Sequence, residues 1–300
     1  MTFKARCRIE LPDGFRRDDV LAFHRRDAQQ ISERIDGNVL QKGLVWDGVP
    51  ACLELRFGER SVAAQLTLDG DELPDVRKRL RATVRRMLGL TQPVEVFERA
   101  YRKHPLIGKL IARNRGLRVP LTATPFEAMA WAITGQQISV SAAVSVRRRF
   151  IQAAGPRHSG GLWCFPQAAQ VARLGEDDLR QVGFSNSKAA TLLALSEQIQ
   201  QGHLPLDDWV DTPDEEEIRG RLIAMRGIGP WTVGYALLRG FGWLDGSLHG
   251  DVAVRRNLQE LLAREDKIGE VEAQAWLMAF SPWRALVAAH LWAMKKSEGY

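Results

Sequence analysis

The spacing of apolar residues changes once along the chain, and this change constrains the fold more than any other feature of the sequence. Between residues 5 and 11, apolar side chains alternate with charged ones, which is the period-two pattern of a half-buried strand. Beyond about residue 93 the strand pattern disappears and apolar residues repeat at helical spacing. The sequence therefore predicts an α+β chain, with a mixed α/β domain over 1–90 and a mostly helical region over 91–300.

The predicted N-terminal domain contains several strands and a basic helix. After a polar stretch at 18–35, which we expect to be helical, three further strand-like runs follow at 39–45, 51–57 and 62–68. The turn-forming triplets WDG and GER separate these runs, so we expect a meander of antiparallel hairpins. In the stretch 73–88, Val and Leu repeat every four residues among Arg and Lys, which predicts an amphipathic helix.

The region after residue 93 is predicted to be a set of short helices joined by short connectors. Thr124 and Pro125 open the first of them, because these residue types favour the N-cap and the first helical position. The other expected helices lie at 139–153, 188–201, 215–226, 231–239, 252–263, 270–279 and 283–296. The pattern is typical of an all-α region without internal repeats.

Charge and cysteine content narrow the class of protein. The 300 residues carry 42 Lys and Arg against 36 Asp and Glu, a net charge of +6, which fits a polyanionic partner as well as many other proteins. Three scattered cysteines without a CxxC pair argue against a disulfide framework, an iron–sulfur cluster or a zinc site, and favour a reducing cytoplasm. The charged N-terminus lacks the apolar core of a signal peptide, and no segment approaches the length of a membrane span.

The segment MRGIGPWTVGYALLRG at 225–240 joins two predicted helices through a glycine-rich turn. Gly227 and Gly229 permit a positive φ and a close backbone approach, and Pro230 suits the first position of a helix. The N–H groups that open the second helix are then free to bind an anion, and a repeated anion indicates nucleic-acid phosphate. An ordinary helical hairpin with a glycine turn is the alternative.

Twenty residues beyond Trp231, the segment SLHGDVAVRRNL places Asp251 before an apolar, arginine-bearing helix. A helical hairpin, a glycine turn and an aspartate at this distance resemble the helix-hairpin-helix DNA glycosylase superfamily. Three further segments extend the resemblance to the bacterial 3-methyladenine DNA glycosylase II family: FEAMAWAITGQQIS at 126–139, CFPQAAQVARL at 164–174 and PWRALVAAHLW at 282–292. The resemblance covers most of the chain, strongest over 120–295 and weaker over 1–90.

The resemblance implies an active site. Asp251 matches the catalytic aspartate of the family, which would stabilise the positive charge that develops on the sugar as the base leaves and would orient the attacking water. An aspartate before a helix is also an ordinary N-cap. Trp231 and Trp292 match an aromatic base pocket, whose electron-rich faces favour cationic alkylated purines, and Tyr235 is a further candidate. Core packing is the alternative for all three, and it is our expectation for the remaining candidates, Trp131, Trp276 and Trp283.

The resemblance also implies how DNA is held. The family rotates the target nucleotide out of the duplex and fills the gap from the loop that here contains Gln136 and Gln137. Gln137 is at the wedge position, where a well-studied branch has an apolar side chain, and a polar helix–helix loop is the alternative. Arg255 and Arg256 lie one turn beyond the aspartate and can meet phosphates. The resemblance further implies a monovalent cation on three main-chain carbonyl groups, those of Ile223, Met225 and Gly227.

These features together predict a monofunctional DNA N-glycosylase that excises alkylated purines in base-excision repair. Trp231 stands where bifunctional members carry a lysine nucleophile, so water is the expected nucleophile. The alternatives are a glycosylase for oxidised or deaminated bases and a non-catalytic helix-hairpin-helix DNA-binding protein. We expect a cytoplasmic monomer that acts on damaged double-stranded DNA, has no membrane partner, and needs no cofactor beyond the structural cation.

Overall fold

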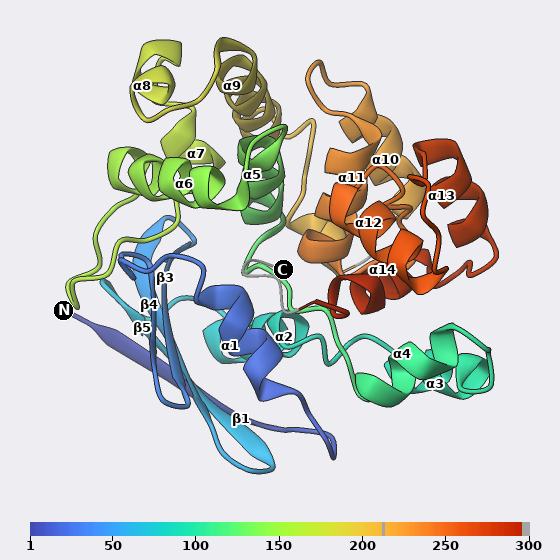
Figure 1. Cartoon of the computed structure of the whole chain (residues 1–300). Helices are drawn as coiled ribbons and strands as arrows, with labels where there is room; N and C mark the ends of the chain where they lie inside the picture. The colour runs from blue at the N-terminus through green and yellow to red at the C-terminus, as the bar shows by residue number, and fades with distance from the viewer. Residues whose placement is uncertain (212–213, 296–300) are drawn as a thin grey trace.

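The computed structural model describes residues 1–211 and 214–295, and it places a sheet domain beside two groups of helices (Figure 1). The sheet contains five strands in the order β1-β5-β4-β3-β2, and neighbouring strands are antiparallel. The strands are β1 (Phe3–Glu10), β2 (Glu33–Asp36), β3 (Val39–Trp46), β4 (Val49–Phe57) and β5 (Ser61–Leu68). The predicted antiparallel meander is confirmed, and β2 is added to it.

Two helices, α1 (Arg17–His24) and α2 (Val76–Met87), share a core with the sheet. The helix predicted over 18–35 was wrong beyond α1. The N–H of Gln29 donates to the Asp27 carboxylate at 3.0 Å, a local turn that competes with helix. The chain then re-enters the sheet as β2, which the polar character of this stretch concealed.

The rest of the described chain is helical, as predicted. The helices are α3 (Val94–Tyr101), α4 (Ile107–Arg113), α5 (Pro125–Gly135), α6 (Val140–Ala154), α7 (Ala168–Val171), α8 (Glu176–Gln181), α9 (Asn186–Gln200), η1 (Asp208–Val210), α10 (Glu215–Ile223), α11 (Pro230–Ala236), η2 (Leu237–Phe241), α12 (Val252–Leu261), α13 (Glu270–Met278) and α14 (Arg284–Trp292). Each helix expected from the sequence is present, with ends shifted by a few residues. Residue 296, the predicted end of the last helix, lies outside the described residues. Four short α-helices, α3, α4, α7 and α8, and the 3₁₀ turn η1 were not predicted.

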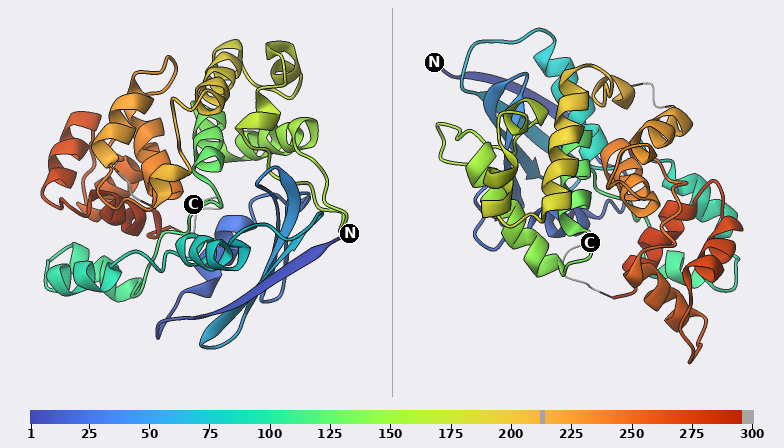
Figure 2. Two further views of the ribbon diagram at one scale, coloured as in Figure 1. Left: turned by 180° about the vertical axis from the view of Figure 1, so that it is seen from behind. Right: turned by 90° about the horizontal axis from the view of Figure 1, so that it is seen from above.

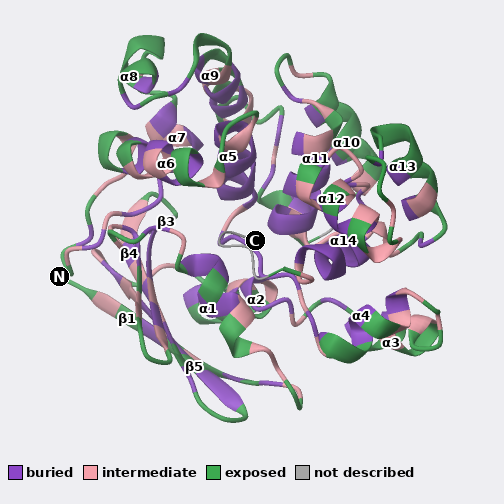
Figure 3. Cartoon of the chain, viewed as in Figure 1, coloured by how far each residue is buried: buried purple, intermediate pink, exposed green. Residues whose placement is uncertain are grey.

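The helices form two lobes with separate cores. One core contains residues of α9 and α10, the other contains residues of α3, α4, α12 and α14, and α6 contributes to both. Helix α5 contributes to both cores and is buried along almost its entire length (Figure 3). Helix α11 and the π-helical turn η2 also contribute to both, so the lobes meet along these elements. This confirms the predicted two-lobed helical region.

Helix α2 joins the sheet domain to the elements that the two lobes share. It lies between the sheet and the helices when the molecule is seen from behind (Figure 2). Arg86, in the last turn of α2, donates to the backbone carbonyl groups of Ala123 at 2.5 Å and Gly240 at 2.7 Å. Burial lowers the pKa of Arg86 to about 10. Among the described residues, no helix combines the length and apolar character needed to cross a membrane.

Candidate active site

Asp251 is a buried carboxylate, with 3% of its surface exposed, at the N-cap of α12. Its Oδ1 accepts hydrogen bonds from the backbone N–H of Val254 at 2.9 Å and from Trp292 Nε1 at 3.2 Å. Its Oδ2 accepts a hydrogen bond from Trp231 Nε1 at 3.0 Å. All three donors are neutral, so dipoles rather than the charge of a bonded cation hold this carboxylate in place.

Three helices bring this constellation together. Trp231 lies in the first turn of α11, directly after the glycine turn, and Trp292 is the last residue of α14. Trp292 is buried, whereas Trp231 remains partly exposed. The indole N–H groups of both tryptophans predicted for the base pocket therefore orient the carboxylate. The sequence did not predict these two hydrogen bonds.

Tyr235, the third predicted pocket residue, lies under Trp231. Its exposed fraction is 2%, and its ring centroid is 5.5 Å from that of Trp231. It belongs to the same core as Trp131, which is buried, and as Trp276 and Trp283, which are partly buried. The prediction of core positions for these last three residues is confirmed. Tyr235 supports the wall of the site from inside the protein.

The hairpin between α10 and α11 has one glycine in the left-handed region. Gly227 has φ +87°, and a Cβ at this position would lie 2.1 Å from Thr191 Oγ1. Both glycines permit a positive φ, but only Gly227 adopts one: Gly229 has φ −100° and is the extended N-cap of α11. A Cβ at Gly229 would meet no atom within 4 Å. Ile228, between the two glycines, is 4% exposed and packs in the core of its lobe.

The loop after α5 separates its two glutamines. The Gln136 amide donates to the Gly227 carbonyl at 3.0 Å and to Thr232 Oγ1 at 2.9 Å, so it joins α5 to the hairpin. Lys188 supports the same loop, because its Nζ donates to the carbonyl groups of Thr134 at 2.9 Å and Gln136 at 2.7 Å. Burial lowers the pKa of Lys188. Gln136 is thus fixed within the protein in this state.

The tip of the loop is exposed. Gln137 has φ +54°, and Ile138 next to it leaves 41% of its surface exposed. Ile138 was not among the predicted DNA-contacting residues, although its apolar side chain in the polar sequence GQQIS was the available signal. The loop therefore presents an exposed amide and an exposed apolar side chain next to each other.

The two arginines predicted to contact DNA differ in their surroundings, and the predicted cation site is partly hydrogen-bonded. Arg255 forms an ion pair with Glu270 at 2.6 Å, whereas Arg256 is exposed. At the predicted cation site, the carbonyl groups of Met225 and Gly227 accept hydrogen bonds from Ile228 N–H and the Gln136 amide. A carbonyl oxygen has two lone pairs, so these bonds leave room for a cation. Among the described residues, no group of His, Cys, Asp and Glu could hold a metal ion.

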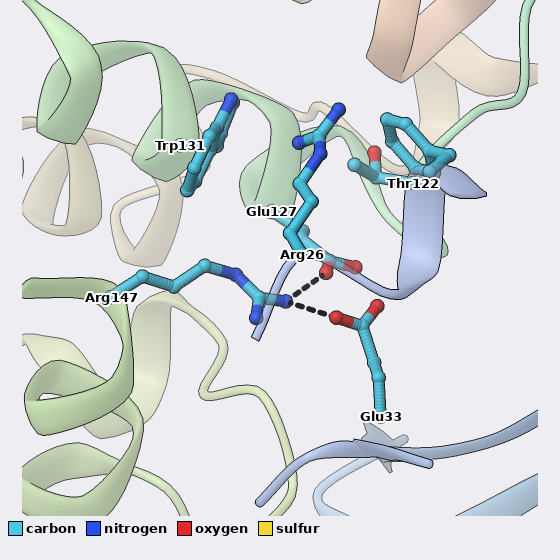
Figure 4. Close-up of a pocket in the computed structure, with 7 residues that line it drawn as sticks. Arg26, Glu33, Thr122, Glu127, Trp131 and Arg147 are labelled. Atoms are coloured by element: carbon cyan, nitrogen blue, oxygen red, sulfur yellow. Dashed lines mark hydrogen bonds and ion pairs between the residues drawn. The ribbon is translucent and has the colours of Figure 1, made fainter. Parts of the chain in front are cut away.

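A second set of buried charges lies between the sheet domain and α5 (Figure 4), and the sequence did not predict it. Lys42 Nζ lies 2.7 Å from Glu33 and 2.6 Å from Glu127, and Arg147 bridges the same carboxylates at 3.2 and 3.0 Å. His24 Nδ1 is 2.7 Å from Glu33. Burial alone would raise the pKa of both carboxyl groups, but Lys42 and Arg147 outweigh it and hold each pKa below its usual value. Burial lowers the pKa of His24.

A cavity of about 20 Å³ adjoins these ion pairs, and Arg26, Thr122 and Trp131 also line it. In Figure 4 the Arg26 guanidinium points away from the ion pairs, alongside the Trp131 ring. Its Cζ lies 4.9 Å from the centroid of that ring. The cavity has room for one water molecule, so it is too small for a nucleobase.

Comparison with known proteins places this geometry in a family. Residues 130–281, more than half of the chain, match the model of the HhH-GPD superfamily of base excision DNA repair proteins. The chain belongs to this superfamily. Residues 8–124 match a second model, the AlkA N-terminal domain. The sheet domain and the hairpin region thus each have a counterpart in the superfamily's architecture.

Individual members of the superfamily match this chain over different fractions of its length. The putative DNA-3-methyladenine glycosylase YfjP of Bacillus subtilis is 28% identical over 62% of this chain, and the match spans 64% of YfjP, less than two thirds of its length. The DNA-3-methyladenine glycosylase of the same organism is 22% identical over 95% of both chains. The 3-methyladenine DNA glycosylase from Archaeoglobus fulgidus shares the fold, with a TM-score of 0.81, 22% identity, and coverage of 95% of this chain and 97% of that one.

Proposed function

We propose that this superfamily member is a monofunctional DNA N-glycosylase that excises alkylated purines from double-stranded DNA. The observation that carries the proposal is the buried Asp251 carboxylate, held by the indole N–H groups of Trp231 and Trp292 directly beside the hairpin. A structural N-cap requires only the bond to Val254. The two further indole donors fix both oxygens, which indicates that the carboxylate is held in place for a chemical role.

The chemistry follows from the charge of the transition state. When the bond between a purine nitrogen and C1′ of deoxyribose breaks, positive charge develops on the sugar. A preorganised carboxylate next to that carbon stabilises the charge without needing to reorganise. Asp251 supplies this carboxylate and orients a water molecule toward C1′. Because its donors are neutral, its negative charge remains available to the developing cation.

Recognition of the lesion rests on Trp231, the partly exposed tryptophan of the site. Its indole ring offers an electron-rich face, which attracts a cationic base such as 3-methyladenine more than the normal base. The similarity to proteins named DNA-3-methyladenine glycosylases supports this substrate class.

The DNA itself is held by the hairpin and the loop after α5. We propose that backbone N–H groups near Gly229 bind phosphate, with a monovalent cation on the hairpin carbonyl groups, and that the loop tip fills the gap left by the everted nucleotide. Gln137 and Ile138 are both exposed there, and Arg256 is free to approach phosphate. The protein acts as a monomer in the cytoplasm, where the chromosome is accessible.

The deciding experiment is incubation of the protein with methylated duplex DNA, followed by chromatography of the released bases. We expect wild-type protein to release 3-methyladenine and 7-methylguanine. The Asp251→Asn variant should release neither at a comparable rate, yet should still bind a duplex with an abasic site. Wild-type protein that binds such a duplex but releases no base would support the non-catalytic DNA-binding alternative. Release of only oxidised or deaminated bases would support the alternative of a glycosylase for those bases.

The monofunctional assignment has its own test. Trp231 carries no nucleophile, and the two backbone carbonyl groups that bind Lys188 Nζ hold that amine in place. We therefore expect borohydride to trap no protein–DNA adduct, and strand breaks to appear only after alkali or an abasic-site endonuclease is added. A covalent complex at stoichiometric yield that disappears in Lys188→Met would overturn the assignment and identify the amine.

A further inference from the structure

Arg239 connects the candidate active site to the sheet domain. It lies on the π-helical turn η2, is 3% exposed, and donates from Nη1 to the Pro120 carbonyl at 2.8 Å. Its Cζ is 5.6 Å from the ring centroid of Trp292 and 4.6 Å from that of Phe23. The guanidinium therefore has ring contacts in both domains. Irregular helical turns of this kind are frequent at functional sites.

Phe23 is the contribution of the sheet domain to this contact. It lies near the end of α1, is 5% exposed, and also has the guanidinium of Arg26 at 4.1 Å from its centroid. Arg26 in turn contacts the Trp131 ring of α5. Phe23 is thus held by two cations, and its position is fixed relative to α5 and η2.

The series of contacts from Phe23 to Arg239 to Trp292 ends at the carboxylate, because Trp292 Nε1 donates to Asp251 Oδ1. A cation over the face of an indole is attracted to the ring and limits its rotation. It also withdraws electron density from the ring, which strengthens the indole N–H as a hydrogen-bond donor. The position of the Asp251 carboxylate therefore depends on a contact whose last member belongs to the other domain.

We propose that Phe23 and Arg239 are positioning residues for the glycosylase reaction, and that the sheet domain acts on the chemical step through them. This inference rests on the proposed function, because it assumes that Asp251 stabilises the transition state. It assigns the sheet domain a part in catalysis in addition to its part in stability. The alternative is that these contacts only join the domains.

The two possibilities differ in what Phe23→Leu changes. If Phe23 positions the site, the single-turnover rate of base release falls about tenfold, since small misplacements of reacting groups have effects of this size or larger. Affinity for a duplex with an abasic site stays within twofold, because the hairpin contacts are untouched. Phe23→Tyr, which keeps the ring, restores the rate. The matched control is Phe15→Leu, which removes a different ring contact within the sheet domain, with Phe57.

Arg239→Gln keeps the proposal testable if Phe23→Leu does not fold, and a double-mutant cycle sharpens the test if it does. Arg239→Gln keeps a donor for the Pro120 carbonyl but removes the cation, so it should lower the rate as Phe23→Leu does, and the two effects should not add. A wild-type rate in folded Phe23→Leu, an equal loss in Phe15→Leu, or additive losses in the double variant would each overturn the proposal. Absence of base release by the wild-type protein would instead overturn the proposed function.

Discussion

In the described part of the molecule, two sites of buried carboxylates are built differently. Glu33 and Glu127 are bound by Lys42 and Arg147, so two negative charges meet two positive charges within hydrogen-bond distance. Asp251 is bonded by two indole N–H groups and one backbone N–H, all of them neutral. Both arrangements satisfy buried acids, but only the second is bonded without a counter-charge.

This difference indicates that the ion cluster contributes to stability and that Asp251 contributes to the chemical reaction. A carboxylate that is already paired with a cation has little remaining attraction for a new positive charge, so the ion cluster serves to join the sheet domain to α5 and α6. A carboxylate held by dipoles keeps its field and can act on a cation that forms beside it. A substitution in the ion cluster should therefore lower the stability of the fold, whereas a substitution at Asp251 should lower the rate of base release.

The largest effect is expected for Asp251→Asn. Loss of the negative charge should lower the single-turnover rate of base release by about 10³-fold, the upper range for removal of one preorganised electrostatic group. Asparagine keeps an oxygen for the N-cap bond, but its amide nitrogen cannot accept the Trp231 indole N–H, so the free energy of unfolding should fall by about 1–3 kcal/mol. Base release on methylated DNA and urea denaturation measure the two quantities. A rate within tenfold of wild type would contradict the distinction between the sites.

Glu127→Gln should show the opposite behaviour. It leaves Lys42 and Arg147 buried with one carboxylate fewer, which should lower the free energy of unfolding by about 3–5 kcal/mol. The rate of base release per folded molecule should stay within about twofold of wild type, because the charge near the leaving base is unchanged. The matched control is Glu216→Gln, which breaks an exposed pair with Arg219 and should cost at most about 1 kcal/mol. Equal losses in the two variants would mean that the buried cluster contributes no more than a surface pair.

The sequence predicted these two sites unequally, for physical reasons. Asp251, Trp231 and Trp292 were identified because the hairpin and the aspartate keep a local spacing that resembles a known family. The ion cluster was not predicted, since Glu33 and Glu127 are 94 positions apart and only the packing of β2 on α5 brings them together. The indole hydrogen bonds were missed for the same reason, as they depend on three helices that converge.

Local turn chemistry explains most of the other differences. The stretch from 25 to 32 has a polar composition that suits a helix surface, but the Asp27 turn ends α1 and returns the chain to the sheet. At the hairpin, sequence alone could not say which glycine takes the left-handed conformation. Periodicity, by contrast, located the long amphipathic helices reliably, because their buried face is a property of each helix alone.

Acid should destabilise the lobe that contains α14 and the carboxylates of the ion cluster over different pH ranges. Burial lowers the pKa of His290, in the core beside Phe97, to about 4. Its neutral form is favoured on folding, so this contribution is complete above pH 6.5, the ordinary value, and is lost as pH falls toward 4. The loss should be about 3 kcal/mol, at 1.36 kcal/mol per unit. His290→Gln should flatten the denaturation profile over this range.

The carboxylates of the cluster titrate at lower pH, which provides the comparison. The pKa of Glu127 lies below its ordinary value of 4.5, so its stabilising contribution is present above pH 4.5 and is lost as pH falls further. A His290→Gln profile should thus keep its decline below pH 4.5 while losing part of the decline above it. An unchanged slope between pH 6.5 and 4.5 would show that His290 does not contribute.

The smallest effect is expected at the hairpin, where two neighbouring glycines should respond in opposite ways. Gly227 needs its φ of +87° and leaves no room beside Thr191, so Gly227→Ala should lower the free energy of unfolding by about 1–3 kcal/mol. Gly229 has an ordinary φ of −100° and open space where a side chain would project. Gly229→Val should therefore fold with a melting temperature close to that of the wild type.

The open space at Gly229 is where a DNA backbone can approach the first N–H groups of α11. A valine there should hold phosphate away and remove about one charge-assisted hydrogen bond, which corresponds to roughly a tenfold loss of affinity. The loss should be the same for damaged and undamaged duplexes, because phosphate contacts carry no base information. Fluorescence anisotropy with matched duplexes at fixed salt measures it. Unchanged affinity in folded Gly229→Val would mean that the hairpin only shapes the protein, and loss confined to damaged DNA would move the contact from the backbone to the everted base.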